Sequence, residues 1–287
     1  MYPVIIWFWG INHPQRVELR LVLDSFTGQM EESMNTIFVF LMVSALLLSL
    51  AGCGGLKSSD VGVALYYEEN AQVELFSPAG TRVLIDIANP YALLNPAGAN
   101  DILLTTHSHG DHLNTSFADS FPGKQIRIEK GSIQQGDVNI QSIQGSHNST
   151  PPPDQGSNYI YIVDMGSMRF VHFGDLGQDN LTPEQLTAIG KVDVAFMQLA
   201  NPYSSMDATN KKGFNLMDQV KPRLIIPTHI DESATQYAIQ KWPAYYWDQK
   251  SLALSPASLG SETRILFLGD LSKAVGKANN LPLWGSK

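Results

Sequence analysis

The chain has 287 residues, of which 44% are hydrophobic and 16% charged, and it contains a single cysteine. This is the composition of an ordinary globular protein and excludes an intrinsically disordered chain. The formal net charge of −8 disfavours a nucleic-acid partner, because binding a phosphate backbone requires clustered lysine and arginine. With one cysteine, an intramolecular disulfide and a zinc site built from several thiolates are both excluded.

An almost purely apolar segment covers residues 37–50 and runs into Leu50-Ala51-Gly52-Cys53. The segment is short for a helix that crosses a bilayer, which needs about 20 residues, but it has the length of a signal-peptide core. Because it ends at the only cysteine, it resembles a bacterial lipobox. That resemblance implies cleavage before Cys53 and a lipid anchor on its thiol.

The start of the chain is therefore expected to fall into three parts. These are a leader at residues 1–33, which a start at Met34 would omit, a signal peptide at 34–52 and a lipidated linker at 53–60. The protein would then be lipid-anchored in the cell envelope, facing the periplasm or the exterior. The alternative is an uncleaved N-terminal anchor helix, since Met34-Asn35-Thr36 supplies no basic residue before the apolar segment.

Short apolar, β-branched runs predict many strands in the rest of the chain. The predicted strands cover residues 62–67, 72–77, 81–87, 102–106, 125–129, 138–143, 158–164, 167–173, 192–199, 222–228, 251–254 and 263–268. Helices are predicted at 183–189, 214–220 and 232–242, with Thr182 as the N-cap of the first. Residues 201–212 are expected to form a polar loop.

The most distinctive stretch is His107-Ser108-His109-Gly110-Asp111-His112, which follows a predicted strand and precedes a segment that can open a helix. A strand-to-helix turn presents polar side chains at the edge of a sheet, where they can hold a metal ion. Neutral imidazole and carboxylate ligands suit zinc, manganese or iron. The alternative is a solvated histidine-rich loop, which three histidines at this spacing disfavour.

This stretch resembles the metal-binding signature of the metallo-β-lactamase superfamily. The resemblance requires, in order, an isolated histidine after a strand, an aspartate that closes a strand, and a histidine at a further strand end. His147, Asp175 and His229 occur in that order. The implied fold is α/β, a four-layer αβ/βα sandwich over residues 61–270 with a tail at 271–287. Two halves of strands followed by helices fit this fold.

The family pattern, carried over residue by residue, implies a site for two divalent ions. It places His107, His109 and His147 on one ion, Asp111, His112 and His229 on the other, and Asp175 on both. Asp111 and Asp175 are then the candidate catalytic carboxylates. The ions, zinc first and manganese or iron as alternatives, imply a hydrolase in which a shared hydroxide attacks an ester, lactone or phosphodiester. A positive site in an acidic protein favours a small, anionic substrate.

The sequence also suggests structural roles for residues near this pattern. Asp86 closes a strand and either orients a ligand histidine or forms a turn. His172 faces the side of its strand that the superfamily does not use for ligands, so a hydrogen-bonded core residue is expected. Gly174 is expected to let the backbone approach closely while Asp175 turns into the cleft. The aromatic run 245–247 is expected to pack rather than line a pocket.

The spacing looks most like the branch that contains L-ascorbate phosphate lactonase and N-acyl phosphatidylethanolamine phospholipase D. Gly110 stands where flavodiiron proteins have a glutamate, which disfavours reduction of oxygen or nitric oxide. Asp175 stands where β-lactamases of the commonest subclass have a cysteine. Two alternatives to this hydrolase remain: a non-catalytic metal-binding envelope protein for sensing or partner binding, and a β-lactam hydrolase.

Overall fold

The computed structural model describes residues 5–8, 17–20, 62–68, 71–150, 157–269, 275–277 and 279–285. The chain divides into two units, Met1–Gly55 and Leu56–Lys287. In the first unit, β1 (Ile5–Phe8) and β2 (Val17–Arg20) pair as antiparallel strands. The expected signal peptide, the linker with Cys53 and parts of the expected tail lie outside the described residues. Within the described ranges, no helix has the length and apolar character to span a membrane.

One sheet of the second unit has six strands in the order β15-β3-β4-β5-β6-β7. The strands are β3 (Val63–Tyr67), β4 (Val73–Phe76), β5 (Arg82–Ile85), β6 (Ile102–Thr105), β7 (Lys124–Arg127) and β15 (Ser251–Leu254). Pairing is antiparallel from β15 to β5 and parallel from β5 to β7. Since β15 comes from the far end of the chain, the two halves of the sequence share this sheet.

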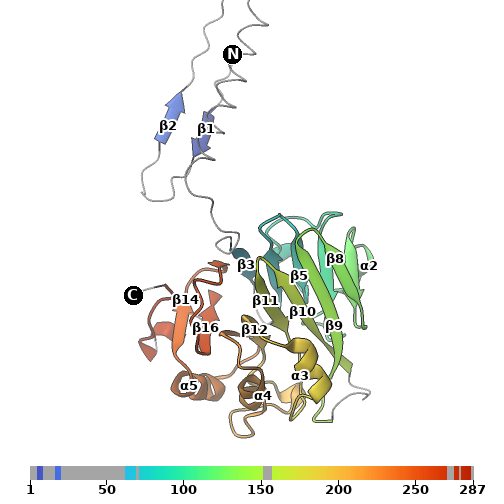
Figure 1. Cartoon of the computed structure of the whole chain (residues 1–287), viewed down its shortest axis with the longest axis vertical. Helices are drawn as coiled ribbons and strands as arrows, with labels where there is room; N and C mark the ends of the chain where they lie inside the picture. Colours follow the sequence, from blue (N-terminus) through green and yellow to red (C-terminus); the bar gives the residue numbers. More distant parts are fainter. Residues whose placement is uncertain are drawn as a thin grey trace, which may run out of the picture. The chain divides into compact units, whose positions relative to one another are not determined.

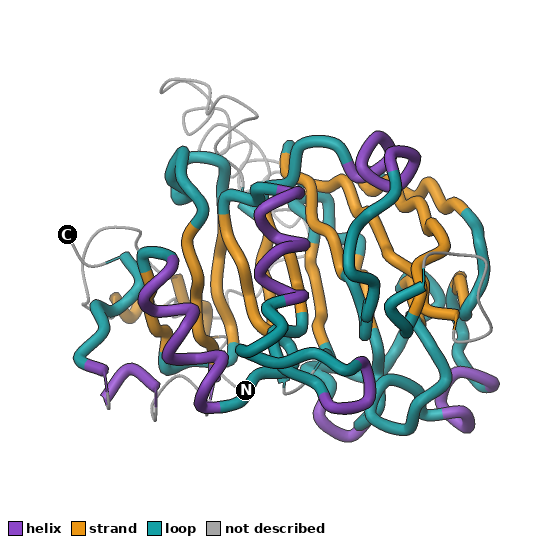
Figure 2. Tube along the Cα trace, turned by 90° about the horizontal axis from the view of Figure 1, so that it is seen from below, coloured by secondary structure: helices purple, strands orange, loops and turns teal. Residues whose placement is uncertain are grey.

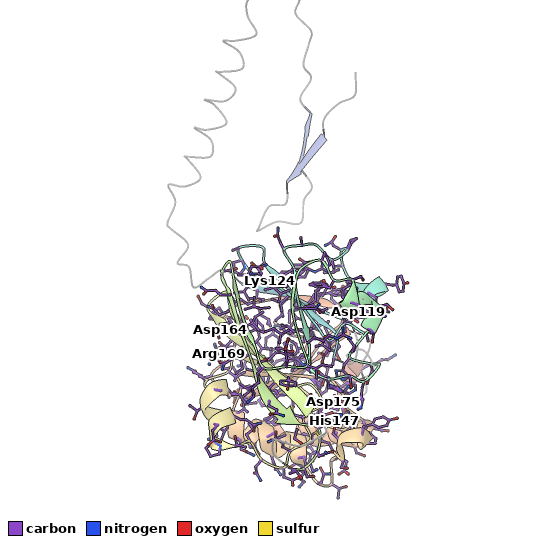
Figure 3. The ribbon with its side chains drawn as sticks, turned by 90° about the vertical axis from the view of Figure 1, so that its right-hand side faces the viewer. Asp119, Lys124, His147, Asp164, Arg169 and Asp175 are labelled. Carbon is purple, nitrogen blue, oxygen red and sulfur yellow. The ribbon has the colours of Figure 1, made fainter. Side chains whose placement is uncertain are left out.

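The other sheet has eight strands in the order β14-β16-β13-β12-β11-β10-β9-β8. The strands are β8 (Ser132–Gln135), β9 (Val138–Ser146), β10 (Ser157–Met165), β11 (Met168–His172), β12 (Val194–Met197), β13 (Leu224–Pro227), β14 (Ala244–Trp247) and β16 (Arg264–Leu268). The predicted β10–β11 hairpin is confirmed. Asp164 Oδ1 and Arg169 Nε, 2.7 Å apart, pair across it (Figure 3).

Four α-helices and two 3-10 helices connect the described strands. They are α2 (Thr115–Asp119), α3 (Pro183–Ile189), α4 (Lys212–Val220), α5 (Glu232–Lys241), η2 (Pro90–Ala92) and η3 (Pro202–Ser204). Helix α3 begins and ends at the predicted residues. Thr182 forms a capping box with Gln185, which fixes the first turn.

The strand β12 shows how the layers form. All four of its residues are buried, which is expected for a parallel strand covered on both faces. Val194 and Phe196 pack between the two sheets, whereas Ala195 and Met197 pack against the helix side. This alternation follows from the two-residue period of a strand.

Helices cover the outer face of each sheet (Figures 1 and 2). Side chains of α3, α4 and α5, such as Phe214 of α4, pack in one cluster with the outer face of the eight-stranded sheet. Ala118 of α2 packs with Leu84 and Leu103 of the six-stranded sheet. The order helix, sheet, sheet, helix confirms the predicted four-layer sandwich.

Two strands of the second unit were missing from the sequence-based expectation. The strand β8 forms the end of the eight-stranded sheet and has a weakly apolar sequence. The aromatic run 245–247 belongs to β14, paired with β16. Its expected packing role is correct, since Tyr245 and Trp247 pack on the core between the sheets.

Candidate metal centre

The seven predicted ligands follow four strands. Four of them lie in the loop after β6, and His147, Asp175 and His229 follow β9, β11 and β13. The strands β9, β11 and β13 run in one direction, because β9 and β11 are both antiparallel to β10 and the pairs from β11 to β13 are parallel. Their carboxyl ends therefore meet at one edge of the sheet, where a ligand is expected.

The side chains form two groups of potential ligand atoms, which lie within 4.8 Å of one another in each group. The groups are His107, His109, His147 and Asp175, and Asp111, His112 and His229. The structure thus brings all seven residues together, with Asp175, expected to serve both ions, in the first group.

The carboxylate of Asp175 lies between the two groups. Its Oδ2 is 3.7 Å from His107 Nε2 and 3.6 Å from His147 Nε2. Its Oδ1 is 3.2 Å from His112 Nε2 and 3.4 Å from His229 Nε2. Figure 3 shows Asp175 beside His147. Each carboxylate oxygen therefore faces a different group, which is the arrangement of a bridging ligand.

Unpaired polar atoms at this point fit a cation. Among the described residues, His107 Nε2, His147 Nε2 and Asp175 Oδ1 are buried without a hydrogen-bond partner. An unsatisfied buried polar group costs about 1–3 kcal/mol. His112 Nε2 and His229 Nε2 are 3.2 Å apart, close to the separation of roughly 3.3 Å that follows from zinc–nitrogen distances in a tetrahedral site. This donor set fits zinc or a similar divalent ion.

Asp86 holds the imidazole of His112 from behind. Its Oδ2 lies 2.7 Å from His112 Nδ1 and accepts a hydrogen bond from Thr106 Oγ1, also at 2.7 Å. Its Oδ1 accepts from the Thr106 backbone N–H at 2.8 Å. The φ angle of Asp86 is 51°, a left-handed conformation that aspartate tolerates better than most residues. Both expectations for Asp86 therefore hold: it forms the turn and it orients a candidate ligand.

Burial and neighbouring charges separate the pKa values of these groups. Burial lowers the pKa of His107 to about 3, and the nearby His112 acts in the same direction. Burial also lowers the pKa of His112, but the carboxylates of Asp86 and Asp175 outweigh it and raise that pKa to about 10. For Asp175, burial raises the pKa, yet the neighbouring His112 and His147 outweigh it and hold that pKa well below its usual range. A neutral His107 and an ionised Asp175 are the forms that bind cations.

The turn before Asp175 requires a glycine. Gly174 has a φ of +55°, and a Cβ there would lie 2.3 Å from Asn158 Oδ1 and 2.7 Å from Thr106 Cβ. No larger residue fits without displacing these neighbours. The expectation of a close backbone approach at Gly174 is confirmed.

His172 lies outside both groups, as expected. It is buried, its Nε2 is 3.0 Å from the Ala71 carbonyl oxygen, and its Nδ1 accepts from the Gly174 N–H at 3.1 Å. Both ring nitrogens therefore have partners within the protein, and His172 supports the turn that carries Asp175.

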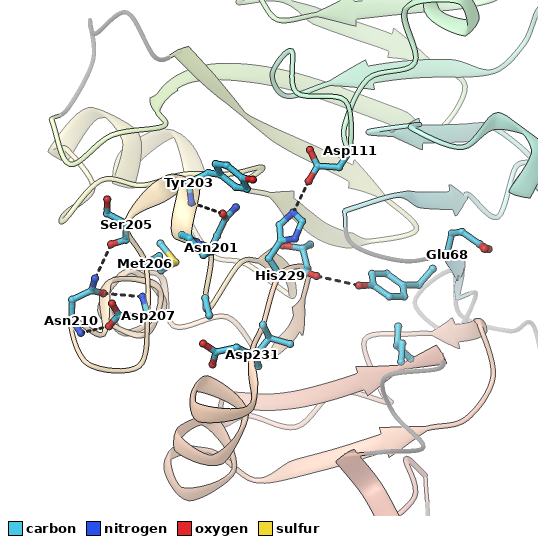
Figure 4. Close-up of a pocket in the computed structure, with 16 residues that line it drawn as sticks. Glu68, Asp111, Asn201, Tyr203, Ser205, Met206, Asp207, Asn210, His229 and Asp231 are labelled. Atoms are coloured by element: carbon cyan, nitrogen blue, oxygen red, sulfur yellow. Dashed lines mark hydrogen bonds and ion pairs between the residues drawn. The ribbon is translucent and has the colours of Figure 1, made fainter.

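A cavity of about 870 Å³ opens beside the second group, and Asp111 and His229 form part of its wall (Figure 4). Tyr203 of η3 lines it with a side chain that is 83% exposed. The Tyr203 ring centroid is 6.4 Å from that of His109. The described residues that line the cavity include the carboxylates Glu68, Asp207 and Asp231 but no lysine or arginine.

The sequence-based interpretation missed the cavity wall formed by residues 200–210. It assigned most of this segment to a polar loop, whereas η3 and the bridge between Asn201 and Met206 give it a defined structure. A signal was present, because the segment follows a buried strand between the strands that deliver Asp175 and His229. A loop at that position must lie at the edge that carries the site.

The chain is similar to several solved structures. A candidate zinc-dependent hydrolase of the metallo-β-lactamase superfamily from Thermotoga maritima covers 72% of this chain and 99% of its own, with 18% identity and a TM-score of 0.53. The match to a candidate metal-dependent hydrolase from Parabacteroides distasonis covers 61% of this chain and 86% of the hydrolase, with 18% identity and a TM-score of 0.48. The match to the metallo-β-lactamase fold protein YhfI from Bacillus subtilis covers 71% of this chain and 96% of YhfI, with 12% identity and a TM-score of 0.46. The first of these shows a shared fold.

At the level of sequence, no curated protein matches the chain significantly. The profile of the β-lactamase superfamily domain matches residues 65–229. This region begins in β3 and ends at His229, so it contains both groups of candidate ligands. The chain therefore belongs to the metallo-β-lactamase superfamily of hydrolases.

Proposed function

We propose that this protein is a hydrolase with two divalent metal ions, zinc in the first place and manganese or iron as alternatives. The observation that carries the proposal is the carboxylate of Asp175, whose two oxygens face two separate groups of histidines. His107, His109 and His147 are the proposed ligands of one ion, Asp111, His112 and His229 those of the other, and Asp175 the ligand of both.

Two such ions, when bound, lower the pKa of water to about 7 and polarise the scissile carbonyl or phosphoryl oxygen. Asp175 and Asp111 are the proposed catalytic carboxylates. Asp175 fixes the relative positions of the two groups. The Asp111 side chain is 48% exposed and lines the cavity, so its carboxylate can hold the proton of the attacking water. As the new carbon–oxygen or phosphorus–oxygen bond forms and the ester bond breaks, this proton passes to the leaving oxygen.

We propose a small ester, lactone or phosphodiester as the substrate, with an anionic reactive group directed at the ions. A cavity of about 870 Å³ is within the usual range for small-molecule sites. Its wall carries carboxylates and, in the described part of the chain, no lysine or arginine. The part of the substrate that lies away from the ions should therefore be neutral or positively charged. The resemblance to the lactonase and phospholipase D branch supports a lactone or phosphodiester.

We further propose that the protein is lipid-anchored in the cell envelope through Cys53 and has no nucleic-acid partner. The support is the apolar segment that ends at the only cysteine and the absence of a basic run in the sequence. Expression with a radiolabelled fatty acid tests the anchor. Label should enter the wild-type chain and not a Cys53→Ala variant, whereas equal labelling of both would contradict the proposal.

Metal analysis tests the proposed function directly. The full chain, purified in detergent and reconstituted with zinc or manganese, should retain about two equivalents of metal. It should hydrolyse at least one class in a panel of activated lactones, phosphodiesters, thioesters and β-lactams. Asp175→Ala should abolish this turnover while the circular dichroism spectrum is preserved. Absence of bound metal, or unchanged turnover in Asp175→Ala, would overturn the proposal.

A further inference from the structure

The segment Ala-Asn-Pro-Tyr occurs twice, at residues 88–91 and 200–203, each time shortly after a buried strand. In both copies the asparagine caps a 3-10 helix. Asn89 Oδ1 accepts from the Tyr91 N–H at 3.2 Å, and Asn201 Oδ1 accepts from the Tyr203 N–H at 3.0 Å. The local role of the two asparagines is therefore the same.

Their surroundings differ. The side chain of Asn89 is exposed, whereas Asn201 is 5% exposed and its amide points to the candidate metal centre. Asn201 Nδ2 donates to Asp175 Oδ2 at 2.7 Å and to Gln198 Oε1 at 2.8 Å. Only the second copy of the segment thus contacts the bridging carboxylate.

The hydrogen-bond network fixes the orientation of the Asn201 amide. The Tyr203 N–H requires an acceptor, so the amide oxygen must face it and the NH₂ group must face Asp175. Gln198 donates from Nε2 to the Leu176 carbonyl oxygen at 2.9 Å, which leaves its Oε1 as the acceptor for Asn201. Both amide hydrogens of Asn201 therefore have acceptors, and the network leaves no alternative rotamer with equal bonding.

The carboxylate of Asp175 needs such a contact. Its terminal torsion is broad and intrinsically soft. The contacts with Asn158 Oδ1 and Ser204 Oγ involve the backbone N–H and carbonyl of Asp175, not its carboxylate. Asn201, by contrast, donates a hydrogen bond to the carboxylate itself. A hydrogen bond to a charged acceptor is roughly twice as strong as a neutral one.

We propose that Asn201 is a positioning residue that holds the Asp175 carboxylate in its bridging orientation, with Oδ2 towards His107 and His147. The inference rests on the proposed dinuclear function. It adds a coupling between the site and the substrate cavity, because the same side chain caps η3 and thereby places Tyr203 at the cavity wall.

Three variants of the full chain test this role. Asn201→Ala removes both the cap and the contact with Asp175, Asn201→Ser retains a capping hydroxyl that is too short to reach Asp175, and Asn89→Ala removes the equivalent cap elsewhere. The dissociation constants for zinc are measured by competition with a chelator, together with kcat and KM. Both Asn201 variants should bind zinc about 10–100-fold more weakly and lose kcat more than they change KM. Asn89→Ala should stay within about twofold of wild type.

Other results would overturn either the positioning role or the proposed function. Wild-type zinc affinity in both Asn201 variants would overturn the positioning role. So would recovery of affinity in Asn201→Ser alone, because the cap would then be sufficient, or an equal loss in Asn89→Ala. Failure of the wild-type chain to bind zinc would instead overturn the proposed function itself.

Discussion

The imidazole Nδ1 of His112 and the carboxylate Oδ2 of Asp86 lie 2.7 Å apart, and both side chains are completely buried. Because Thr106 donates to both oxygens of the same carboxylate, Asp86 cannot rotate away. The ring of His112 is therefore held with its Nε2 towards Asp175. A carboxylate behind a ligand histidine fixes its tautomer and raises its basicity.

Replacement of Asp86 by asparagine should weaken metal binding at this histidine. The asparagine side chain would keep the size of the aspartate and tolerate the φ of 51°, but the charge that faces His112 would be lost. We expect zinc affinity to fall by about 10–100-fold while the secondary structure is unchanged. Competition with a chelator measures the affinity, and an unchanged dissociation constant would show that Asp86 serves only the turn.

Metal uptake should release a proton. In the metal-free protein the pKa of His112 is raised to about 10, since the carboxylates of Asp86 and Asp175 outweigh burial. The imidazole is therefore protonated at pH 7 and must lose its proton to become a ligand. Calorimetry in buffers of different ionisation enthalpy should detect release of about one proton at pH 7, and less above pH 10. A binding enthalpy independent of the buffer at pH 7 would contradict this.

The same pKa shifts predict how the stability of the metal-free protein depends on pH. The pKa of His112 in the folded protein is about 10, above its ordinary value of 6.5. Its contribution to the free energy of unfolding is therefore complete below pH 6.5 and is lost as pH rises to about 10. The pKa of His107 is lowered to about 3. Its contribution to the free energy of unfolding is therefore present above pH 6.5 and is lost as pH falls to about 3. Urea unfolding between pH 4 and 10 should therefore show lower stability at both ends. Stability that keeps rising above pH 7 would exclude the His112 effect.

The histidine motif and most strands could be recognised because their signals are local, whereas His147, Asp175 and His229 were proposed as ligands from the family pattern. His112 lies in a dense histidine motif, and a short β-branched run such as β13 has one plausible structure. Asn201 could not be predicted in the same way. Its sequence neighbourhood is nearly that of Asn89, and only the tertiary placement of Asp175 distinguishes the two. The strand β8 was missed because its polar residues give no apolar period, and pairing with β9 determines its structure.

Alanine at position 174 should destabilise the fold more than alanine at another glycine of positive φ. Gly174 and Gly80 have φ values of +55° and +88°, but a Cβ meets Asn158 and Thr106 at position 174 and nothing within 4 Å at position 80. Gly80→Ala measures the backbone strain alone, about 1–2 kcal/mol. Gly174→Ala adds steric overlap and should cost clearly more in urea unfolding, with loss of bound zinc. Equal costs would mean that the site relaxes around the methyl group.

His172 provides the sharpest contrast with the candidate ligand histidines. In His172→Asn, the side-chain oxygen can replace Nδ1 as the acceptor for the Gly174 N–H, while the contact with the Ala71 carbonyl oxygen is lost. An unsatisfied buried acceptor should lower the free energy of unfolding by about 1–3 kcal/mol, but the zinc content should not change. His229→Ala removes a side chain of the second group and should lower the retained zinc towards about one equivalent. Elemental analysis and urea unfolding of both variants check this, and a loss of zinc in His172→Asn equal to that in His229→Ala would mean that the ligand set is wrongly assigned.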